Sequence, residues 1–240
     1  MKQLPLDLGH DVRHGEEDFL ESPSNEAALA MIRLWPDWPN RMLLLTGPEG
    51  SGKTHLGAIW ARRAQARRLV AADLTPGSLQ SLAAQPAIWL DDADRALFDE
   101  KLLFHLLNMR AEQGGFLLVT AQLPVDRWGL ATADLLSRLR RAPHVVIEAP
   151  DDALMRAVLV KLFFDRQVLV EENVIDFLAL RLDRSLGAAQ QIVAALDHEG
   201  LSRRRAITRP MAAALLQVIG DNHDLAEIER GGETDDLSRG

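Results

Sequence analysis

Short apolar runs alternate with segments of helical periodicity over the first 150 residues. Five of these runs are bounded by polar or turn residues, as buried strands are. They are residues 42–46, 69–72, 87–90, 116–120 and 145–147. Between them, apolar positions three and four residues apart predict helices, the clearest over 27–35, 54–68 and 100–113. This alternation predicts an α/β fold built on a parallel sheet.

The pattern changes after Ala149-Pro150-Asp151. Only helical periodicity follows, over 152–165, 172–182, 186–197 and 211–218. The change predicts a second, all-helical subdomain of about seventy residues. We therefore expect four parts: a flexible arm, an α/β domain, a helical lid and an acidic disordered tail. Their ranges are 1–18, 19–149, 150–220 and 221–240.

A phosphate-binding motif follows the first predicted strand. Residues 47–54 fit G-x-x-x-x-G-K-[ST], whose glycines let backbone N–H groups close around phosphate oxygens. Lys53 adds a mobile positive charge, and the Thr54 hydroxyl is a ligand for Mg²⁺. A strand before the motif and a helix after it are the context that a nucleotide-phosphate cradle requires. The alternative is a glycine-rich turn with a chance lysine.

Polar side chains end the third and fourth predicted strands of the domain. At the carboxyl end of a strand beside a phosphate loop, Asp91 is expected to join the Mg²⁺ shell and Asp92 to polarise the attacking water. The alternative is a turn or a helix cap. Thr120 is positioned to sense the γ-phosphate or to orient water. Its alternative is a solvated strand end.

Composition limits the class of protein. The chain has 240 residues, 47% of them hydrophobic, and no run of about 18 apolar residues that would span a membrane. Its start lacks the features of a signal peptide, so we expect a cytoplasmic protein. Zero cysteines exclude disulfides and thiolate metal sites, and the seven histidines lack metal-ligand spacing.

The net charge of −8 is distributed unevenly. Residues 221–240 hold seven acidic and two basic side chains, a net −5, which leaves −3 for the rest. Excess charge and low hydrophobicity predict that this tail is disordered. A nearly neutral body argues against broad non-specific DNA binding, whose affinity comes from neutralising phosphates. The possibility that a local basic patch binds DNA stays open.

Two further segments suggest partners. Residues 3–8 read Gln-Leu-Pro-Leu-Asp-Leu, an extended peptide whose leucines either dock in another protein's groove or pack on the parent domain. Arginines at 138, 140 and 141 lie near a predicted strand. They either belong to a solvated face or are presented to a neighbour's nucleotide, where a guanidinium stabilises the transition state of phosphoryl transfer.

These parts together resemble an AAA+ ATPase, from about residue 19 to 219. The runs Gly52-Lys53-Thr54-His55-Leu56, Leu90-Asp91-Asp92-Ala93 and Ser137-Arg138-Leu139 are similar to the nucleotide-binding domain of the bacterial replication initiator DnaA. An acidic tail stands where an initiator has a DNA-reading domain, and residues 3–8 resemble peptides that dock on the bacterial sliding clamp. Both features resemble the Hda family of DnaA-related regulators. The resemblance implies a P-loop AAA+ parallel-sheet core with a C-terminal all-helical lid subdomain.

The resemblance also implies residue roles. Arg138 would be the arginine finger, Thr120 the first sensor and Arg184 the second sensor, from the lid. The clamp-binding residues would be Gln3, Leu4, Leu6 and Leu8. The nucleotide-binding residues would be Gly47, Pro48, Gly50, Ser51, Gly52, Lys53, Thr54, His55 and Arg184. Thr120-Ala121-Gln122 departs from the more polar turn of the initiators, which weakens the sensor assignment.

The function that the resemblance implies is negative regulation of chromosomal replication initiation. The protein would bind ADP or ATP with Mg²⁺ and, tethered to the clamp on DNA, stimulate hydrolysis of DnaA-bound ATP. We expect indirect DNA contact, no membrane partner, a possible homo-oligomer and slow intrinsic hydrolysis. One alternative is a helicase-loading or DNA-binding AAA+ ATPase that uses the basic residues in 62–68 and 203–205. The other is a non-catalytic adaptor between clamp and initiator.

Overall fold

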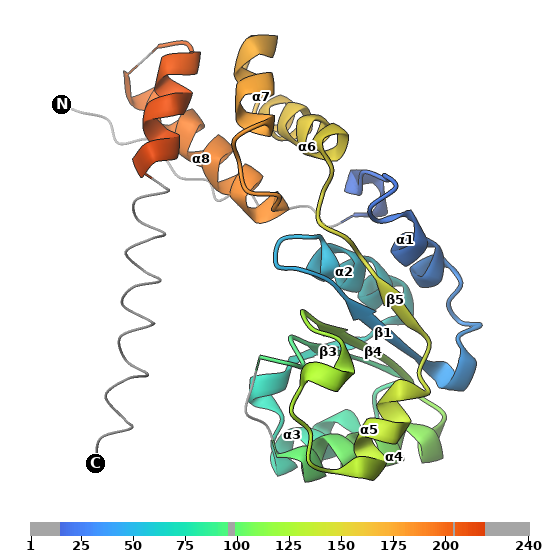
Figure 1. Ribbon diagram of the computed structural model, residues 1–240. Coiled ribbons are helices and arrows are strands. Elements are labelled where there is room, and N and C mark those ends of the chain that lie inside the picture. Colours follow the sequence, from blue (N-terminus) through green and yellow to red (C-terminus); the bar gives the residue numbers. More distant parts are fainter. Residues whose placement is uncertain (1–14, 96–98, 204, 219–240) are drawn as a thin grey trace, which may run out of the picture. The chain divides into compact units, whose positions relative to one another are not determined.

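The computed structural model describes residues 15–95, 99–203 and 205–218. The chain forms two compact units, divided in sequence between Leu154 and Met155 (Figure 1). One unit contains a sheet and the other is helical in its described residues. The predicted clamp-binding residues Gln3, Leu4, Leu6 and Leu8 lie outside the described residues, as does the acidic tail.

The first unit is built on a five-stranded sheet in the order β2-β3-β4-β1-β5 (Figure 1). Every neighbouring pair of strands is parallel. The strands are β1 (Met42–Thr46), β2 (Arg67–Val70), β3 (Ala87–Asp91), β4 (Phe116–Ala121) and β5 (His144–Val146). The predicted α/β fold with a parallel sheet is confirmed.

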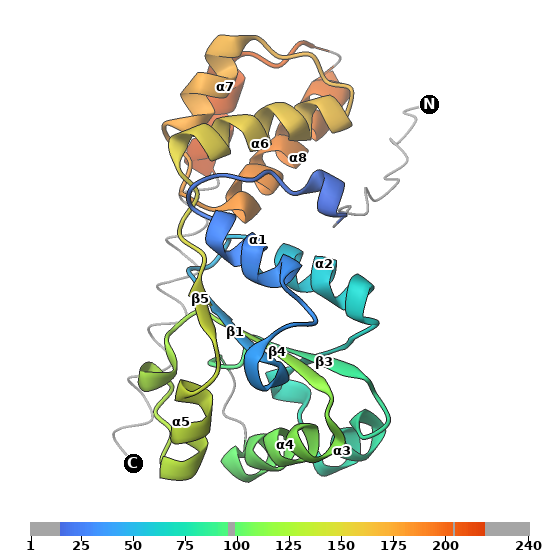
Figure 2. The same cartoon turned by 90° about the vertical axis from the view of Figure 1, so that its right-hand side faces the viewer.

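Helices cover both faces of this sheet (Figure 2). On one face lie α1 (Glu26–Arg33) and α2 (Lys53–Ala64). On the other lie α3 (Pro76–Leu82), α4 (Glu100–Gln113) and α5 (Ala133–Arg140). Because side chains alternate between the two layers, β1, β3 and β4 are buried almost throughout and read as continuous apolar runs.

The helix after the phosphate loop is shorter than the sequence pattern predicts. α2 ends at Ala64, because Gln65 adopts a left-handed conformation with φ 50°. The Ala66 N–H then bonds to the Ala61 carbonyl at 2.9 Å, which closes the last turn. This C-cap position usually holds glycine, so the sequence gives no stop signal there. The chain enters β2 at Arg67, ahead of the predicted strand.

The second unit has its own core. It contains α6 (Asp152–Asp165) from Met155 on, together with α7 (Glu172–Ala179), α8 (Leu186–Arg203) and a helix over 209–218. Its most buried side chains come from α6, α7 and α8, and each is at most 1% exposed; they include Leu159, Phe163, Leu178, Ile192 and Leu196. The bounds of α6 match the prediction, whereas α8 continues past its predicted end at residue 197.

α2 approaches the sheet closely at Gly57. A β-carbon on Gly57 would overlap the indole ring of Trp89 on β3. Trp89 is 2% exposed and enclosed by its neighbours, so the ring has little freedom to move. The helix that begins at the phosphate loop is therefore seated directly on the strand that carries Asp91.

We predict that Gly57→Ala destabilises the protein by about 1–3 kcal/mol, because the added methyl overpacks the contact with Trp89. Urea unfolding followed by circular dichroism measures the change. Gly77→Ala is the matched control, since its β-carbon would meet only Thr75 Oγ1 at 3.9 Å. This control should be neutral or stabilise the protein by up to about 1 kcal/mol. Equal stability of Gly57→Ala and wild type would contradict the packing argument.

Candidate functional site

The phosphate loop joins the carboxyl end of β1 to the start of α2. Gly50 and Gly52 have φ values of 71° and 108°, in the region that favours glycine. A β-carbon on Gly47 would overlap the carbonyl oxygen of Ile147. The shape of the loop therefore depends on these three glycines. Ser51 closes it from inside, since its hydroxyl donates to the Pro48 carbonyl at 2.8 Å.

The first turn of α2 offers backbone donors to a ligand. Gly52 provides no side-chain cap, and the first N–H groups of a helix have no acceptor within it. Together with the helix dipole, such donors form an anion site. Thr54 is exposed in the same turn, so its hydroxyl is accessible. This end of α2 fits a nucleotide phosphate.

Lys53 is folded back onto the loop. Its ammonium donates to the carbonyl oxygens of Gly47 and Pro48, at 2.7 and 2.8 Å, and the residue is 8% exposed. Burial lowers the pKa of Lys53, while the charge of Asp92 acts in the opposite direction. An incoming phosphate would give this ammonium a full negative partner, which two carbonyl groups do not provide.

Asp91 lies at the carboxyl end of β3 and is 2% exposed. Its Oδ1 accepts a hydrogen bond from the Thr120 hydroxyl. Its Oδ2 accepts two from Arg68, from Nε at 3.1 Å and from Nη2 at 2.6 Å. Both oxygens of the predicted metal ligand are therefore engaged by donors. In this arrangement Asp91 does not fit Mg²⁺, which needs a free oxygen in a strict octahedral shell.

Thr120 is fully buried at the end of β4. It accepts a hydrogen bond from the indole N–H of Trp89 at 3.1 Å and donates its own to Asp91. The alternative of a solvated strand end is therefore wrong. Its role as a sensor stays a prediction.

Asp92 follows in a left-handed conformation with φ 53°. Burial raises the pKa of Asp92, as does the charge of Asp91, whereas Arg95 and Lys53 lower it. A non-glycine residue in this conformation is strained, and such strain recurs at functional sites. The charge of Asp92 acts on Lys53 more strongly than that of Asp91. Of Asp91 and Asp92, Asp92 thus has the stronger electrostatic interaction with Lys53 of the phosphate loop. Polarisation of the attacking water stays its predicted role.

Asp94 has a structural role that the sequence pattern did not indicate. Its carboxylate accepts from the backbone N–H groups of Gln122, at 2.9 and 3.0 Å, and Leu123, at 2.7 Å. The Ala93 N–H donates to the Thr120 carbonyl at 2.9 Å. These bonds fix the turn after Asp92 to the end of β4.

His55 connects the phosphate-loop helix to the residues before α1. Its Nε2 donates to the Gly15 carbonyl at 3.0 Å, and its ring lies edge-on to Phe19 with centroids 5.2 Å apart. Glu16 forms an ion pair with Arg33 at 2.9 Å. Residues 15–18, which the sequence pattern placed in the arm, are thus held against α1 and α2. A direct contact of His55 with nucleotide stays a prediction.

Arg138 lies on α5 with 38% of its side chain exposed. Its Nε donates to Asp134 at 3.2 Å, and Nη1 donates to Asn108 on α4. The guanidinium carbon lies 4.7 Å from the ring centroid of Phe104. These contacts hold the guanidinium against α4 and leave part of it accessible. The finger role requires such access and stays a prediction.

The other predicted arginines lie elsewhere. Arg184 is exposed between α7 and α8 in the helical unit, and its role as second sensor stays a prediction. Among the arginines of the DNA-binding alternative, Arg68 pairs with Asp91, and Arg203 pairs with Glu199. Both ion pairs occupy guanidinium groups that the alternative would direct at DNA.

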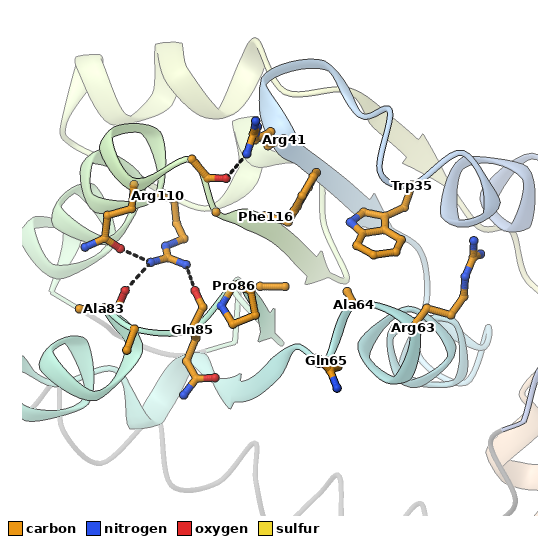
Figure 3. Close-up of a pocket in the computed structure, with 15 residues that line it drawn as sticks. Trp35, Arg41, Arg63, Ala64, Gln65, Ala83, Gln85, Pro86, Arg110 and Phe116 are labelled. Atoms are coloured by element: carbon orange, nitrogen blue, oxygen red, sulfur yellow. Dashed lines mark hydrogen bonds between the residues drawn. The ribbon is translucent and has the colours of Figure 1, made fainter.

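A separate hollow of ≈570 Å³ lies where β3 and β4 begin, at the edge of the sheet opposite the phosphate loop (Figure 3). Arg110 lines it and is 4% exposed, and this burial lowers the pKa of Arg110. Its guanidinium donates to the carbonyl oxygens that end α3 and to a neighbouring amide, in Leu82, Ala83, Gln85 and Gln113. Arg41 likewise donates to the Gly114 carbonyl. Both guanidinium groups are thus bonded to backbone carbonyl groups of neighbouring segments.

Within 15–95, 99–203 and 205–218, three or more His, Cys, Asp or Glu side chains nowhere gather as a metal site would require. Over the same ranges, none of the helices combines the length and apolar character needed to cross a membrane.

Comparison with known proteins shows the fold. No protein-family model matches the chain. Domain III of the Thermotoga maritima replication initiation protein DnaA superposes with a TM-score of 0.77 at 17% identity, covering 90% of this chain and 98% of that one. A replication initiator DnaA bound to AMPPCP and single-stranded DNA gives 0.68 at 16%, covering 81% and 68%. The Thermotoga maritima RuvB Holliday junction branch migration motor gives 0.68 at 17%, covering 86% and 72%.

At these identities the likeness concerns the fold alone. The chain has the AAA+ fold, a parallel-sheet core followed by C-terminal helices. The predicted fold class is therefore confirmed, including the C-terminal all-helical lid subdomain. The narrower resemblance to the Hda family stays a prediction.

The strand that leads into the phosphate loop carries a pH-dependent contact. His144 Nε2 lies 2.6 Å from Thr46 Oγ1; the residue as a whole is exposed, but desolvation of its ring by the surrounding protein lowers the pKa of His144. The unfolded chain therefore takes up this proton first on acidification. The stability that the neutral ring contributes is complete above pH 6.5 and is lost as the pH falls through the lowered folded-state pKa.

We predict that His144→Gln, which is neutral at every pH, flattens the decline in the urea midpoint between about pH 7 and pH 5. Urea titrations at several pH values provide the measurement. The control is His105→Gln at an exposed position of α4, which should keep the wild-type pH dependence. A decline as steep in His144→Gln as in wild type would show that His144 does not titrate in this way.

Proposed function

We propose that this protein is a nucleotide-binding AAA+ regulator of replication initiation that acts on the ATP of a DnaA-type partner. It binds ADP or ATP at the phosphate loop and offers Arg138 to the nucleotide of the partner. ATP hydrolysis takes place at the partner's nucleotide site, where the Arg138 guanidinium stabilises the charge that develops during phosphoryl transfer. Intrinsic hydrolysis by the chain is slow.

The observation that carries this proposal is the position of Arg138 relative to the sheet. Arg138 is on α5, which packs on one face together with α4. The helix α2, which starts at the phosphate loop, packs on the other face. The sheet therefore separates Arg138 from the chain's own phosphate loop. A partly exposed arginine so placed suits a nucleotide on another molecule.

The geometry of the phosphate loop supports nucleotide binding. The uncapped start of α2, the buried Lys53 and the exposed Thr54 hydroxyl are the groups that would hold the phosphates. The DnaA structure of similar fold is bound to AMPPCP. Bound nucleotide would favour one arrangement of the sheet unit and the helical lid. His55 would contribute by fixing the start of α2, and Arg184 would reach the nucleotide from the lid.

The proposal includes a tether to the sliding clamp. It rests on the peptide at residues 3–8, where Gln3, Leu4, Leu6 and Leu8 are the proposed contacts. A tether to the clamp on DNA raises the effective concentration of the regulator near its partner without any new contact between them. DNA is then contacted through the clamp, as expected of a protein with a nearly neutral body.

We predict that Arg138→Ala removes most of the stimulation of DnaA ATP hydrolysis, because an arginine finger contributes about 10³–10⁵ in rate. The measurement is the rate of phosphate release from DnaA-bound ATP in the presence of DNA-loaded clamp. Arg140→Ala is the matched control; Arg140 lies on the same helix and pairs with Asp126. Full stimulation by Arg138→Ala, with its complexes intact, would instead favour a non-catalytic adaptor.

We predict that a Gln3→Ala/Leu4→Ala double variant is lost from DNA-loaded clamp in a pull-down, because its peptide no longer fills the groove. ADP affinity of the same variant should stay at the wild-type value, since the phosphate loop is unchanged. Equal retention of variant and wild type on the clamp would rule out the tether.

A further inference from the structure

A polar cluster lies between α2 and the sheet; Trp89, Asp91 and Thr120 in it are buried, whereas the side chain of Arg68 is half-exposed. It consists of Arg68 on β2, Trp89 and Asp91 on β3, and Thr120 on β4. Arg68 is directly opposite Trp89 in the register of β2 and β3. Asp91 and Thr120 each follow the paired residues Leu90 and Val119. Four side chains from three adjacent strands thus point to the face of the sheet that α2 covers.

Every polar side-chain atom of Asp91 is used within this cluster. The Thr120 hydroxyl engages Oδ1, and Arg68 gives two hydrogen bonds to Oδ2. Charge-assisted bonds of this kind are about twice as strong as neutral ones. Asp91 is 2% exposed, so water does not compete for its oxygens. The carboxylate has its counter-charge from the protein itself.

Arg68 is held in position by more than its charge. Its guanidinium carbon lies 4.8 Å from the centroid of the Trp89 ring. Trp89 in turn donates to Thr120 at 3.1 Å, and Gly57 of α2 packs against its ring. Moving Arg68 away would break its stacking on Trp89 and leave a buried charge on Asp91, which is costly. These contacts hold the half-exposed guanidinium of Arg68 against Asp91.

We propose that Arg68 takes the place of a metal ion at Asp91, so that the phosphate loop binds its nucleotide with little dependence on Mg²⁺. This inference rests on the proposed nucleotide binding. Of the predicted metal ligands, only the Thr54 hydroxyl is accessible, and one hydroxyl together with phosphate oxygens makes a weak protein site for Mg²⁺. Arg68 is a positioning residue: it acts through Asp91 and does not touch the nucleotide.

The test measures binding and needs no hydrolysis. A fluorescent ADP analogue is titrated into the full chain, once with Mg²⁺ and once with EDTA. For wild type we expect the two Kd values to differ by less than about threefold. Arg68→Gln frees Oδ2 of Asp91, so its Kd should become at least about tenfold lower with Mg²⁺ than with EDTA. Electron paramagnetic resonance of Mn²⁺ in the ADP complex should show protein-bound metal only in Arg68→Gln.

Arg67→Gln is the matched control. Arg67 precedes Arg68 on β2, is exposed and points to the other face of the sheet, so this variant should behave as wild type. The comparison of wild-type Kd values with Mg²⁺ and with EDTA tests the inference even if Arg68→Gln does not fold. If wild-type protein binds ADP tenfold more tightly with Mg²⁺ than with EDTA, this inference is overturned, but the proposed function is not. Absence of ADP binding under both conditions overturns the proposed function, and the inference with it.

Discussion

The contact of α2 with β3 determines how the rest of the site is arranged. Gly57 lets the helix approach the Trp89 ring with no β-carbon between them. This contact fixes the distance between the phosphate loop, at the start of α2, and the end of β3, where Asp91 and Asp92 lie. It also closes the polar cluster from solvent on one side. A bulkier residue at position 57 would change the loop and the acids together, since one rigid contact positions both.

Close packing on that face explains the unusual chemistry of the strand ends. A buried carboxylate must be neutralised by something nearby, because an isolated charge in the interior is very unfavourable. In the structure, Arg68 and Thr120 provide this compensation for Asp91. Asp92 is one residue further on, in a strained conformation and more accessible than Asp91. The two neighbouring acids therefore have different surroundings and cannot be exchanged in function.

The ends of helices could be predicted from the sequence where the residues that start or stop the helix are adjacent to it in the chain. The bounds of α4 and α6 match the prediction, because Gly114 stops α4 and the Pro150 segment precedes α6. Local signals failed at Gln65, which ends α2 in a conformation that glycine usually adopts. The sequence pattern therefore extended the helix through Arg68 and missed that this arginine is a strand residue.

The sequence predicted which residues belong to the candidate site better than it predicted their contacts with one another. The phosphate loop could be recognised because its parts are contiguous. The pairing of Arg68 with Asp91 depends on which strands are neighbours and in which register, and no local pattern encodes that. The same holds for the burial of Thr120 and for Arg110, whose backbone acceptors lie 25 or more residues away. Tertiary neighbours decide these environments.

The sheet, with α2 on one face and α5 on the other, also separates two kinds of selective pressure. Substitutions on the exposed side of α5 can accumulate without disturbing the packing under the phosphate loop. Substitutions beneath α2 are constrained by the fixed volume around Trp89. One face of the domain is thus free to diversify while the other preserves the packing beneath the phosphate loop.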